Sequence, residues 1–323
     1  MDAPYSPTEF RLLNDFQRGL PLVAEPFAEI ARQIECPLDD VLAALDRLQK
    51  RGAISRVGAV FAPWRVGVST LAAMAVPPGR LEHVAGQVSA HGEVNHNYQR
   101  EHHYNLWFVA TAADEIALKA VLDGIAAESG CRVLSLPLVE QFHIDLGFDL
   151  CNGIKERPAA GSFQRLALSS EQRRLVAALQ PGLPLVSRPF AAIGHGIGMA
   201  ESDVLTIIED WLKSGVVKRL GVVVRHHELG YTANAMVVFD VPDDAVSAVG
   251  ARLAHEHGVT LCYRRQRHLP QWPYNLYCMV HGRSREEVTP VIERLCQVAG
   301  HPCEVLFSTR RFKQQGARYF NGQ

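Results

Sequence analysis

The sequence predicts an α+β protein built as a tandem duplication, in which each half is a winged helix-turn-helix followed by a ferredoxin-like β-α-β-β-α-β domain. Three observations support this prediction: an internal repeat, helix signals in the first part of each half, and a strand and helix order in the second part. The predicted boundaries are 1–62 and 63–150 for the first pair of domains, 151–165 for a linker, and 166–226 and 227–323 for the second pair.

The repeat is clearest at Gly19–Val23, which recurs as Gly182–Val186 at an offset of 163 residues (182 − 19). The same offset relates three pairs of glycines: Gly52 and Gly215, Gly58 and Gly221, and Gly67 and Gly230. The offset then grows, since 104–106 (Tyr-Asn-Leu) matches 274–276, which indicates a longer loop between two strands of the second half. Residues 151–162 contain Gly, Pro and Ala and suit a linker.

Three helices and a wing are predicted at the start of each half. Ser6–Glu9 forms a capping box with proline at the first helical position, a second helix follows Pro26, and a third runs from about Pro37 to Lys50. Residues 54–61 are interpreted as a small hairpin, the wing. The second half repeats these signals with a cap at Ser169–Gln172, a third helix that ends at Gly215, and a strand at Val216–Val224.

The second part of each half reads as strand, helix, two adjacent strands, helix and strand. The expected ranges are 71–76, 81–91, 114–129 and 132–138 in the first half, and 235–241, 244–257, 284–298 and 303–308 in the second, with the paired strands between the helices. This order predicts a four-stranded antiparallel sheet with helices on one face.

The composition restricts the class of protein. With 323 residues and a 47% hydrophobic fraction, the chain can form several folded cores. No apolar run approaches the roughly 20 residues that a membrane helix needs, and the start of the chain lacks secretory-signal features, so a cytoplasmic location is expected. The seven cysteines are scattered, which does not favour a disulfide framework or a thiolate metal site.

The predicted architecture resembles the leucine-responsive/asparagine-C family of transcription regulators. The resemblance implies that the two sheets pair across a pseudo-twofold axis. The third helices, however, do not favour DNA binding. Their first turns hold Asp39 and Asp40, or Glu201 and Asp203, and these carboxylates would repel a phosphate backbone. Net charge is close to zero, with 33 Lys and Arg against 34 Asp and Glu. Basic residues nearby are interpreted as solvated surface charges: Arg47, Lys50, Arg51, Lys213, Lys218 and Arg219.

Two runs rich in His, Arg, Tyr and Asn, 95–108 and 262–277, carry the candidate chemistry. Strand alternation places His96, Tyr98 and Arg100 on one face, and Tyr263 with Arg265 on one face in the second half. Arginine captures carboxylates, aromatic rings stack on flat ligands, and histidine donates protons or ligates iron. The runs therefore predict a pocket for a flat polycarboxylate, with or without a metal. The alternative is a polar sheet surface with Trp107 and Trp272 in an ordinary core.

Both runs resemble the paired motifs of the siroheme decarboxylases: His96-Asn97-Tyr98-x-Arg100-x-His102-x-Tyr104-Asn105-Leu106-Trp107-Phe108, and Tyr263-Arg264-Arg265 with Trp272-Pro273-Tyr274-Asn275-Leu276. The resemblance implies a carboxy-lyase, with siroheme as substrate, that removes the carboxyl groups of the C12 and C18 acetates. The product, 12,18-didecarboxysiroheme, leads to d-type haem or to an alternative haem pathway. No cofactor and no resident metal are implied. DNA regulation and haem sensing remain alternative functions.

The resemblance also implies roles for single residues. His96 and His102 are the expected acid–base pair, and an axial histidine to the siroheme iron is left open. The expected substrate-binding residues are Tyr98, Arg100, His103, Tyr104, Asn105, Tyr263, Arg264, Arg265, Arg267, His268, Tyr274 and Asn275. Leu261 stands where the first half has His96, so the first run is expected to be catalytic unless His268 substitutes in the second. A homodimer and contacts with other haem-biosynthesis proteins are further expectations, and no membrane contact is expected.

Overall fold

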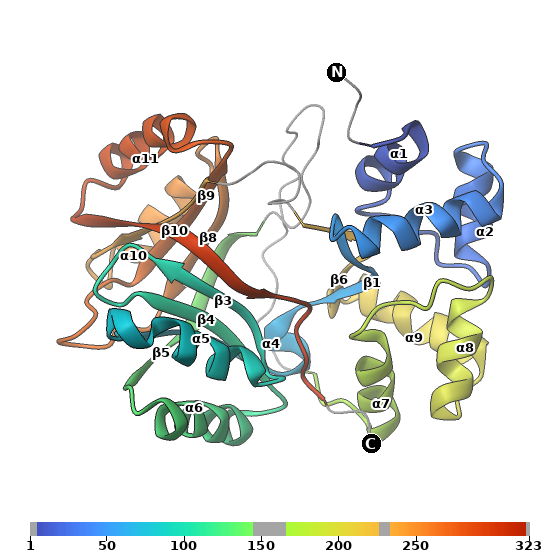
Figure 1. The fold of residues 1–323 in the computed structure, drawn as a ribbon, viewed down its shortest axis with the longest axis horizontal. Helices are drawn as coiled ribbons and strands as arrows, with labels where there is room; N and C mark the ends of the chain where they lie inside the picture. The colour runs from blue at the N-terminus through green and yellow to red at the C-terminus, as the bar shows by residue number, and fades with distance from the viewer. Residues whose placement is uncertain (1–4, 145–165, 226–232, 321–323) are drawn as a thin grey trace.

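The computed structural model describes residues 5–144, 166–225 and 233–320. A part rich in strands and a part made of helices lie side by side, and strands β1 and β6 lie between them (Figure 1). The predicted linker, 151–165, falls outside the described residues. Among the described residues, no helix is long and apolar enough to cross a membrane.

The two helix-turn-helix units contain the predicted helices. These are α1 (Pro7–Asp15), α2 (Pro26–Gln33) and α3 (Leu38–Lys50), followed by α7 (Ser170–Leu179), α8 (Pro189–Ile197) and α9 (Glu201–Lys213). Ser6 and Ser169 both form the complete capping box that the sequence predicted. Leucines from both units, among them Leu12, Leu45 and Leu175, share one buried core, so the units pack as a pair.

The predicted wing hairpin is wrong. Residues 54–61 form one continuous strand, β1 (Ile54–Phe61), which pairs antiparallel with β6 (Val217–Val224) of the other half. Gly58 lies opposite Gly221 in this two-stranded sheet, called here the β1–β6 ribbon. The repeated Gly-Leu-Pro segments explain the pairing, because the backbone N of Leu20 bonds to Leu220 O at 3.0 Å and that of Leu183 to Val57 O at 2.7 Å. Each segment thus binds the strand of the opposite half.

Each half also contains the predicted ferredoxin-like sheet. Its strands are β2 (Val68–Met74), β3 (Val94–Arg100), β4 (Leu106–Ala112) and β5 (Val133–Ile144) in the first half, and β7 (Ala233–Phe239), β8 (Val259–Arg265), β9 (Leu276–Gly282) and β10 (Cys303–Gln314) in the second. The helices α5 (Leu81–Ala90), α6 (Glu115–Ser129), α10 (Val246–Leu253) and α11 (Arg285–Ala299) pack against them, and α4 (Pro63–Val66) and η1 (Pro78–Arg80) are short connections.

The two sheets close into one barrel with the strand order β10-β3-β4-β2-β5-β8-β9-β7. Closure depends on the last strand of each half, which is longer than predicted. Residues 133–137 of β5 pair with β2, and 138–144 pair with β8 of the other half. Strand β10 does the same, pairing first with β7 and then with β3. The expected pseudo-twofold pairing of the sheets is therefore confirmed, and it encloses a common interior.

One pair of cysteines departs from the sequence-based expectation. Cys296 in α11 and Cys303 in β10 form a disulfide across the turn that joins these elements. Cys36, Cys131, Cys262 and Cys278 are free thiols, and the last three are buried. The single disulfide is local, with a sequence separation of 7 residues, so it does not form a framework for the fold.

Candidate active site in the shared barrel

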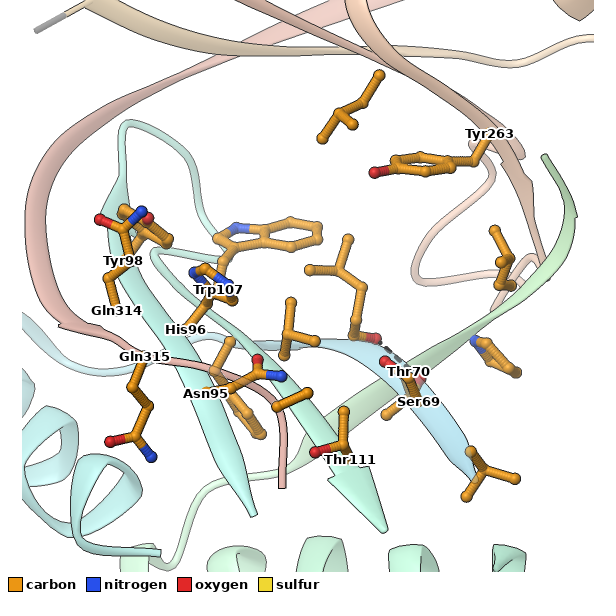
Figure 2. A pocket seen from close by; sticks show the side chains of 18 of the residues that line it. Ser69, Thr70, Asn95, His96, Tyr98, Trp107, Thr111, Tyr263, Gln314 and Gln315 are labelled. Carbon is orange, nitrogen blue, oxygen red and sulfur yellow. Dashed lines mark hydrogen bonds between the residues drawn. The ribbon is translucent and has the colours of Figure 1, made fainter. Parts of the chain in front are cut away.

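A cavity of about 1160 Å³ occupies the barrel interior and extends beside α6 and along the β1–β6 ribbon. Figure 2 shows side chains that line it, among them His96, Trp107 and Tyr263. Its walls come from both halves, and residues 314–317 and Tyr319 of the C-terminal segment complete it. Pockets for drug-sized ligands measure roughly 300–1,000 Å³. This cavity is larger and suits a macrocycle.

Among the charged side chains that line the cavity, cations outnumber carboxylates. The described residues that line it include eight lysines or arginines: Arg56, Arg100, Lys119, Arg132, Lys218, Arg219, Arg225 and Arg265. They include two carboxylates, Glu115 and Asp123, both on α6. The Asp123 carboxylate is paired with Lys119 at 2.5 Å. The excess of positive charge favours an anionic ligand.

Strand β3 presents His96, Tyr98 and Arg100 to this cavity, as the alternation predicted. Asn97, on the opposite face, donates to Ala85 O at 3.1 Å beneath the helices. The rings of His96 and Tyr98 lie nearly parallel, with centroids 6.1 Å apart, and the Arg100 guanidinium lies 5.9 Å from the Tyr98 centroid. The strand thus places an imidazole, a phenol and a guanidinium along one wall.

Strand β8 contributes the corresponding pair Tyr263 and Arg265, with the guanidinium 5.2 Å from the ring centroid. Both arginines also hold the barrel together. Arg100 Nη1 donates to Leu306 O on β10 at 2.8 Å, and Arg265 Nη1 donates to Leu136 O on β5 at 2.9 Å. Within the described part of the chain, the buried Nε of each arginine has no hydrogen-bond partner. Each guanidinium therefore keeps one donor for a ligand.

Burial and a neighbouring charge determine the protonation of His96. Loss of solvent around the ring, and then the positive charge of Arg56, lower the pKa of His96 to about 4. The imidazole is consequently neutral at pH 7 in the unliganded protein. Burial also raises the pKa of Tyr98 and lowers the pKa of Arg100 to about 10, so the phenol stays protonated and the guanidinium stays charged.

His102 lies outside the cavity, in an aromatic cluster on the β3–β4 connection. Its ring contacts Trp272 edge-on, at 5.4 Å between centroids, and is stacked near Tyr104 at 5.9 Å. Nδ1 accepts from the Tyr104 backbone N at 2.9 Å, which leaves the ring proton on Nε2, 3.4 Å from Glu304. Burial lowers the pKa of His102, and Glu304 opposes that shift. The structure therefore does not bring His102 into the cavity with His96.

Tyr274 belongs to the same cluster, and two other histidines lie near it. The Tyr274 ring packs against Trp272 at 4.9 Å, and burial together with Glu304 raises its pKa to about 12. His103 contacts the Tyr104 ring edge-on at 5.0 Å, and His268 is bridged to Trp272 through its backbone. None of these side chains lines the cavity.

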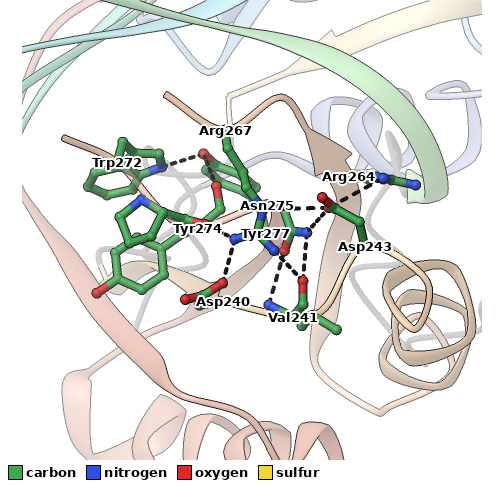
Figure 3. A network of polar contacts seen from close by, with 10 residues as sticks. Asp240, Val241, Asp243, Arg264, Arg267, Trp272, Tyr274, Asn275 and Tyr277 are labelled. Carbon is green, nitrogen blue, oxygen red and sulfur yellow. Dashed lines mark hydrogen bonds and ion pairs between the residues drawn. The ribbon is translucent and has the colours of Figure 1, made fainter. Parts of the chain in front are cut away.

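Four further candidates are engaged in loop contacts. Asn105 binds the backbone N and O of Val76, and Asn275 binds those of Val241. Arg264 pairs with Asp243 at 3.4 Å. Arg267 donates to Asp240, Val241 O and Pro273 O, and it also pairs with Asp243 (Figure 3). These contacts satisfy the side chains within the protein and fix the ends of the strands.

Several residues in the cavity were not expected there. Arg219 is 9% exposed and Lys218 is half-buried, so their interpretation as solvated surface charges is wrong. Arg56 and Arg219 are related by the 163-residue offset of the repeat (219 − 56). The repeat could therefore have identified these two arginines as equivalent positions. His281, which lines the cavity beside Leu261, hydrogen-bonds to Thr260 Oγ1 through Nδ1 at 2.8 Å.

Fold and site together define a duplicated ligand-binding protein whose two sheets enclose one cationic, aromatic-walled cavity. The family models agree with this class. Residues 65–143 and 228–313 match the AsnC-like ligand binding domain, and 9–54 and 172–217 match the siroheme decarboxylase NirDL-like HTH domain. Each model matches twice, once in each half.

Full-length relatives identify the family. The chain is 43% identical over 312 residues, 96% of each chain, to the siroheme decarboxylase NirDL subunit of Paracoccus denitrificans. A crystal structure of the siroheme decarboxylase NirDL superposes with a TM-score of 0.71 at 30% identity, covering 97% of this chain and 94% of that one. A co-complex of NirDL with an iron-uroporphyrin III analogue gives a TM-score of 0.70 at 29% identity over the same shares. The chain belongs to the siroheme decarboxylase family.

Proposed function

We propose that this protein is a carboxy-lyase that removes the C12 and C18 acetate carboxyl groups of siroheme, giving 12,18-didecarboxysiroheme for d-type or alternative haem biosynthesis. The observation that carries the proposal is the common cavity, where His96 lies among arginine and tyrosine side chains from both halves. The membership of this chain in the siroheme decarboxylase family supports the same substrate. Siroheme is a flat macrocycle with many carboxylates, and the cavity offers both aromatic and cationic walls.

The reaction exchanges carbon dioxide for a proton. In each acetate the bond between the methylene carbon and the carboxylate breaks, and its electron pair is delocalised into the protonated macrocycle. Carbon dioxide leaves and the methylene carbon ends as a methyl group with one added proton. Each decarboxylation consumes one proton and transfers no net electrons, so we propose that no redox cofactor takes part. The siroheme iron belongs to the substrate.

His96 is the proposed proton donor, and the substrate is proposed to activate it. The imidazole is neutral at pH 7 in the free protein, because burial and Arg56 lower its pKa to about 4. A substrate carboxylate beside Arg56 would cancel the neighbouring positive charge and raise the pKa of His96. The protonated fraction of His96 would thus be larger in the complex than in the free protein. A proton donor that gains its proton as the substrate binds is matched to its task.

The other candidates divide into two groups by position. Tyr98, Arg100, Tyr263 and Arg265 line the cavity, and we propose that they hold the macrocycle and its carboxylates. His102, His103, Tyr104, Asn105, Arg264, Arg267, His268, Tyr274 and Asn275 lie outside it. We propose that these nine residues position the strand ends that carry the first group, so that their loss acts through the shape of the wall.

Anaerobic incubation with siroheme tests the function directly. The product should be lighter by two carbon dioxide units in mass spectrometry. His96→Gln keeps a side chain of similar polarity without the proton transfer, so turnover should fall by roughly 10²–10⁴-fold while siroheme still binds. Recovery of intact siroheme from wild-type protein that has bound it would indicate a sensing module instead. Full turnover by His96→Gln would remove His96 from the mechanism.

A further inference from the structure

The β1–β6 ribbon carries cations into the cavity although it belongs to the helix-turn-helix units. Arg56 on β1, Lys218 on β6 and Arg225, directly after β6, all line the same cavity as His96. The ribbon lies between the helical units and the barrel (Figure 1). Lys218 and Arg225 are separated by about 23 Å along the strand, at roughly 3.3 Å per residue. The cations therefore form a row along the cavity and not a single point.

Among the described residues, the side-chain hydrogen-bond partners of Arg56 and Lys218 are neutral. Arg56 Nη2 donates to Ala59 O at 3.1 Å, and Lys218 Nζ donates to Gln141 Oε1 at 3.2 Å while lying 4.4 Å from the centroid of the Trp64 ring. The buried Nε atoms of Arg56 and Arg225 have no hydrogen-bond partner among the residues that the structure describes. The two carboxylates that line the cavity are on α6, away from the ribbon. The row thus has donors available for an anion.

Burial of this positive charge is unfavourable unless an anion neutralises it. Removal from solvent lowers the pKa of Lys218 to about 8 and also lowers the pKa of Arg56. Arg56 lies close enough to His96 to influence its titration, so an anion bound at Arg56 would lie beside the proposed proton donor. A ligand with carboxylates spread around its rim could reach Arg56 and Lys218 together.

We propose that the β1–β6 ribbon is a carboxylate-binding subsite that holds carboxylates of the tetrapyrrole which do not react. The inference rests on the proposed function and adds a role for the helix-turn-helix units. Their paired strands recognise substrate, in place of the DNA contacts that a free wing would make. The ribbon selects densely carboxylated macrocycles over haem, whose two carboxylates cannot occupy the whole row while also reaching Arg100 and Arg265.

The test compares two probes on full-length protein: iron uroporphyrin III, which is densely carboxylated, and haem. Lys218→Met and Arg56→Gln should each weaken binding of iron uroporphyrin III about tenfold, as expected for one charge-assisted hydrogen bond. Haem affinity should change less than twofold, and the salt dependence of uroporphyrin binding should decrease. Lys213→Met is the matched control, because Lys213 on α9 is 67% exposed and pairs with Glu209.

Several outcomes would overturn the subsite. Unchanged affinity for iron uroporphyrin III in both variants would contradict the proposal. Equal loss of affinity for iron uroporphyrin III and for haem would also contradict it, because that result would indicate a structural effect on the cavity. Thermal unfolding of each variant identifies such an effect, and Lys218→Arg should restore affinity if charge is the cause. Retained uroporphyrin affinity with loss of a wild-type DNA mobility shift would make the ribbon a nucleic-acid contact. Failure of wild-type protein to convert siroheme would instead contradict the proposed function, whatever the variants bind.

Discussion

The pKa of His96 depends on a residue from another domain. Arg56 reaches the cavity from β1, whereas His96 lies on β3 of the barrel, and the two meet only because the ribbon packs across the barrel. The Arg56 charge adds to the effect of burial and keeps the imidazole neutral at pH 7. In the proposed mechanism, this electrostatic contact couples substrate recognition at Arg56 to proton supply by His96.

Arg56→Gln should raise the pKa of His96 in the unliganded protein from about 4 towards its ordinary value of 6.5. The pKa should remain below 6.5, because burial is the larger cause and is unchanged. The imidazole C–H chemical shifts, followed by NMR between pH 3 and pH 8 in roughly half-unit steps, would report this directly.

His96→Gln identifies the resonance, and Lys213→Met provides a variant that loses a distant positive charge. An unchanged His96 titration in Arg56→Gln would show that burial alone sets the pKa. In that case a carboxylate bound at Arg56 could not be what raises the pKa of His96.

The β1–β6 ribbon is an element whose formation demands glycine. A Cβ added at Gly221 would lie 2.2 Å from Gln17 O and 2.7 Å from Phe16 O, both backbone atoms after α1 of the opposite half. The same segment bonds to the strand through Val222 N and Phe16 O at 2.7 Å. The close approach of the two halves therefore leaves no space for a side chain at this position.

Gly221→Ala should lower the free energy of unfolding by about 2 kcal/mol or more, since backbone must move to admit the methyl group. Gly86→Ala is the matched control, because Gly86 lies inside α5 and an added Cβ would meet nothing within 4 Å. That variant should be more stable by about 0.5–1 kcal/mol. Urea unfolding followed by circular dichroism measures both, and equal stability of the two variants would contradict the close packing of the ribbon.

The sequence predicted the elements of each half well, because their signals are local. Capping boxes mark α1 and α7, and alternation on β3 assigned His96, Tyr98 and Arg100 to one face. Contacts between the halves were not predictable in the same way. The sequence predicts a hairpin over residues 54–61, because nothing within these residues shows that the partner strand lies in the other half.

The same limit explains the charges and the strand ends. Lys218 and Arg219 have the sequence pattern of surface residues, and only the packing of the ribbon on the barrel encloses them. The predicted ends of the last strands, Leu138 and Ser308, coincide with the positions where pairing changes from one half to the other. Beyond these positions each strand pairs with the sheet of the other half, so its residues no longer follow the burial pattern of one sheet. Site residues that depend on long-range pairing were therefore missed.

At the scale of the whole molecule, neither half can form the cavity alone. Strands β3 and β5 of the first half pair with β10 and β8 of the second, and without them these edges and the apolar interior near Trp107 would face solvent. Residues 1–150 expressed alone should therefore bind iron uroporphyrin III at least about tenfold more weakly than the full chain, because half of the cavity wall is missing.

Mixing 1–150 with 166–323 should restore binding and give a complex of the size of the full chain in size-exclusion chromatography. Soret titration of each half, of the mixture and of the intact protein gives the comparison. Binding by 1–150 alone with the affinity of the full chain would show that one sheet suffices, and would contradict a site shared between the halves.

The pairing of Gly58 with Gly221 marks the pseudo-twofold axis, and residues on either side of it have diverged. His96 corresponds to Leu261, and Thr111 to His281. In a dimer of identical subunits every substitution appears twice, so the enclosed chamber must be as symmetric as the assembly. A single fused chain is free of this constraint. Its two walls can differ, and a macrocycle whose rim is itself uneven can then be received in one orientation only.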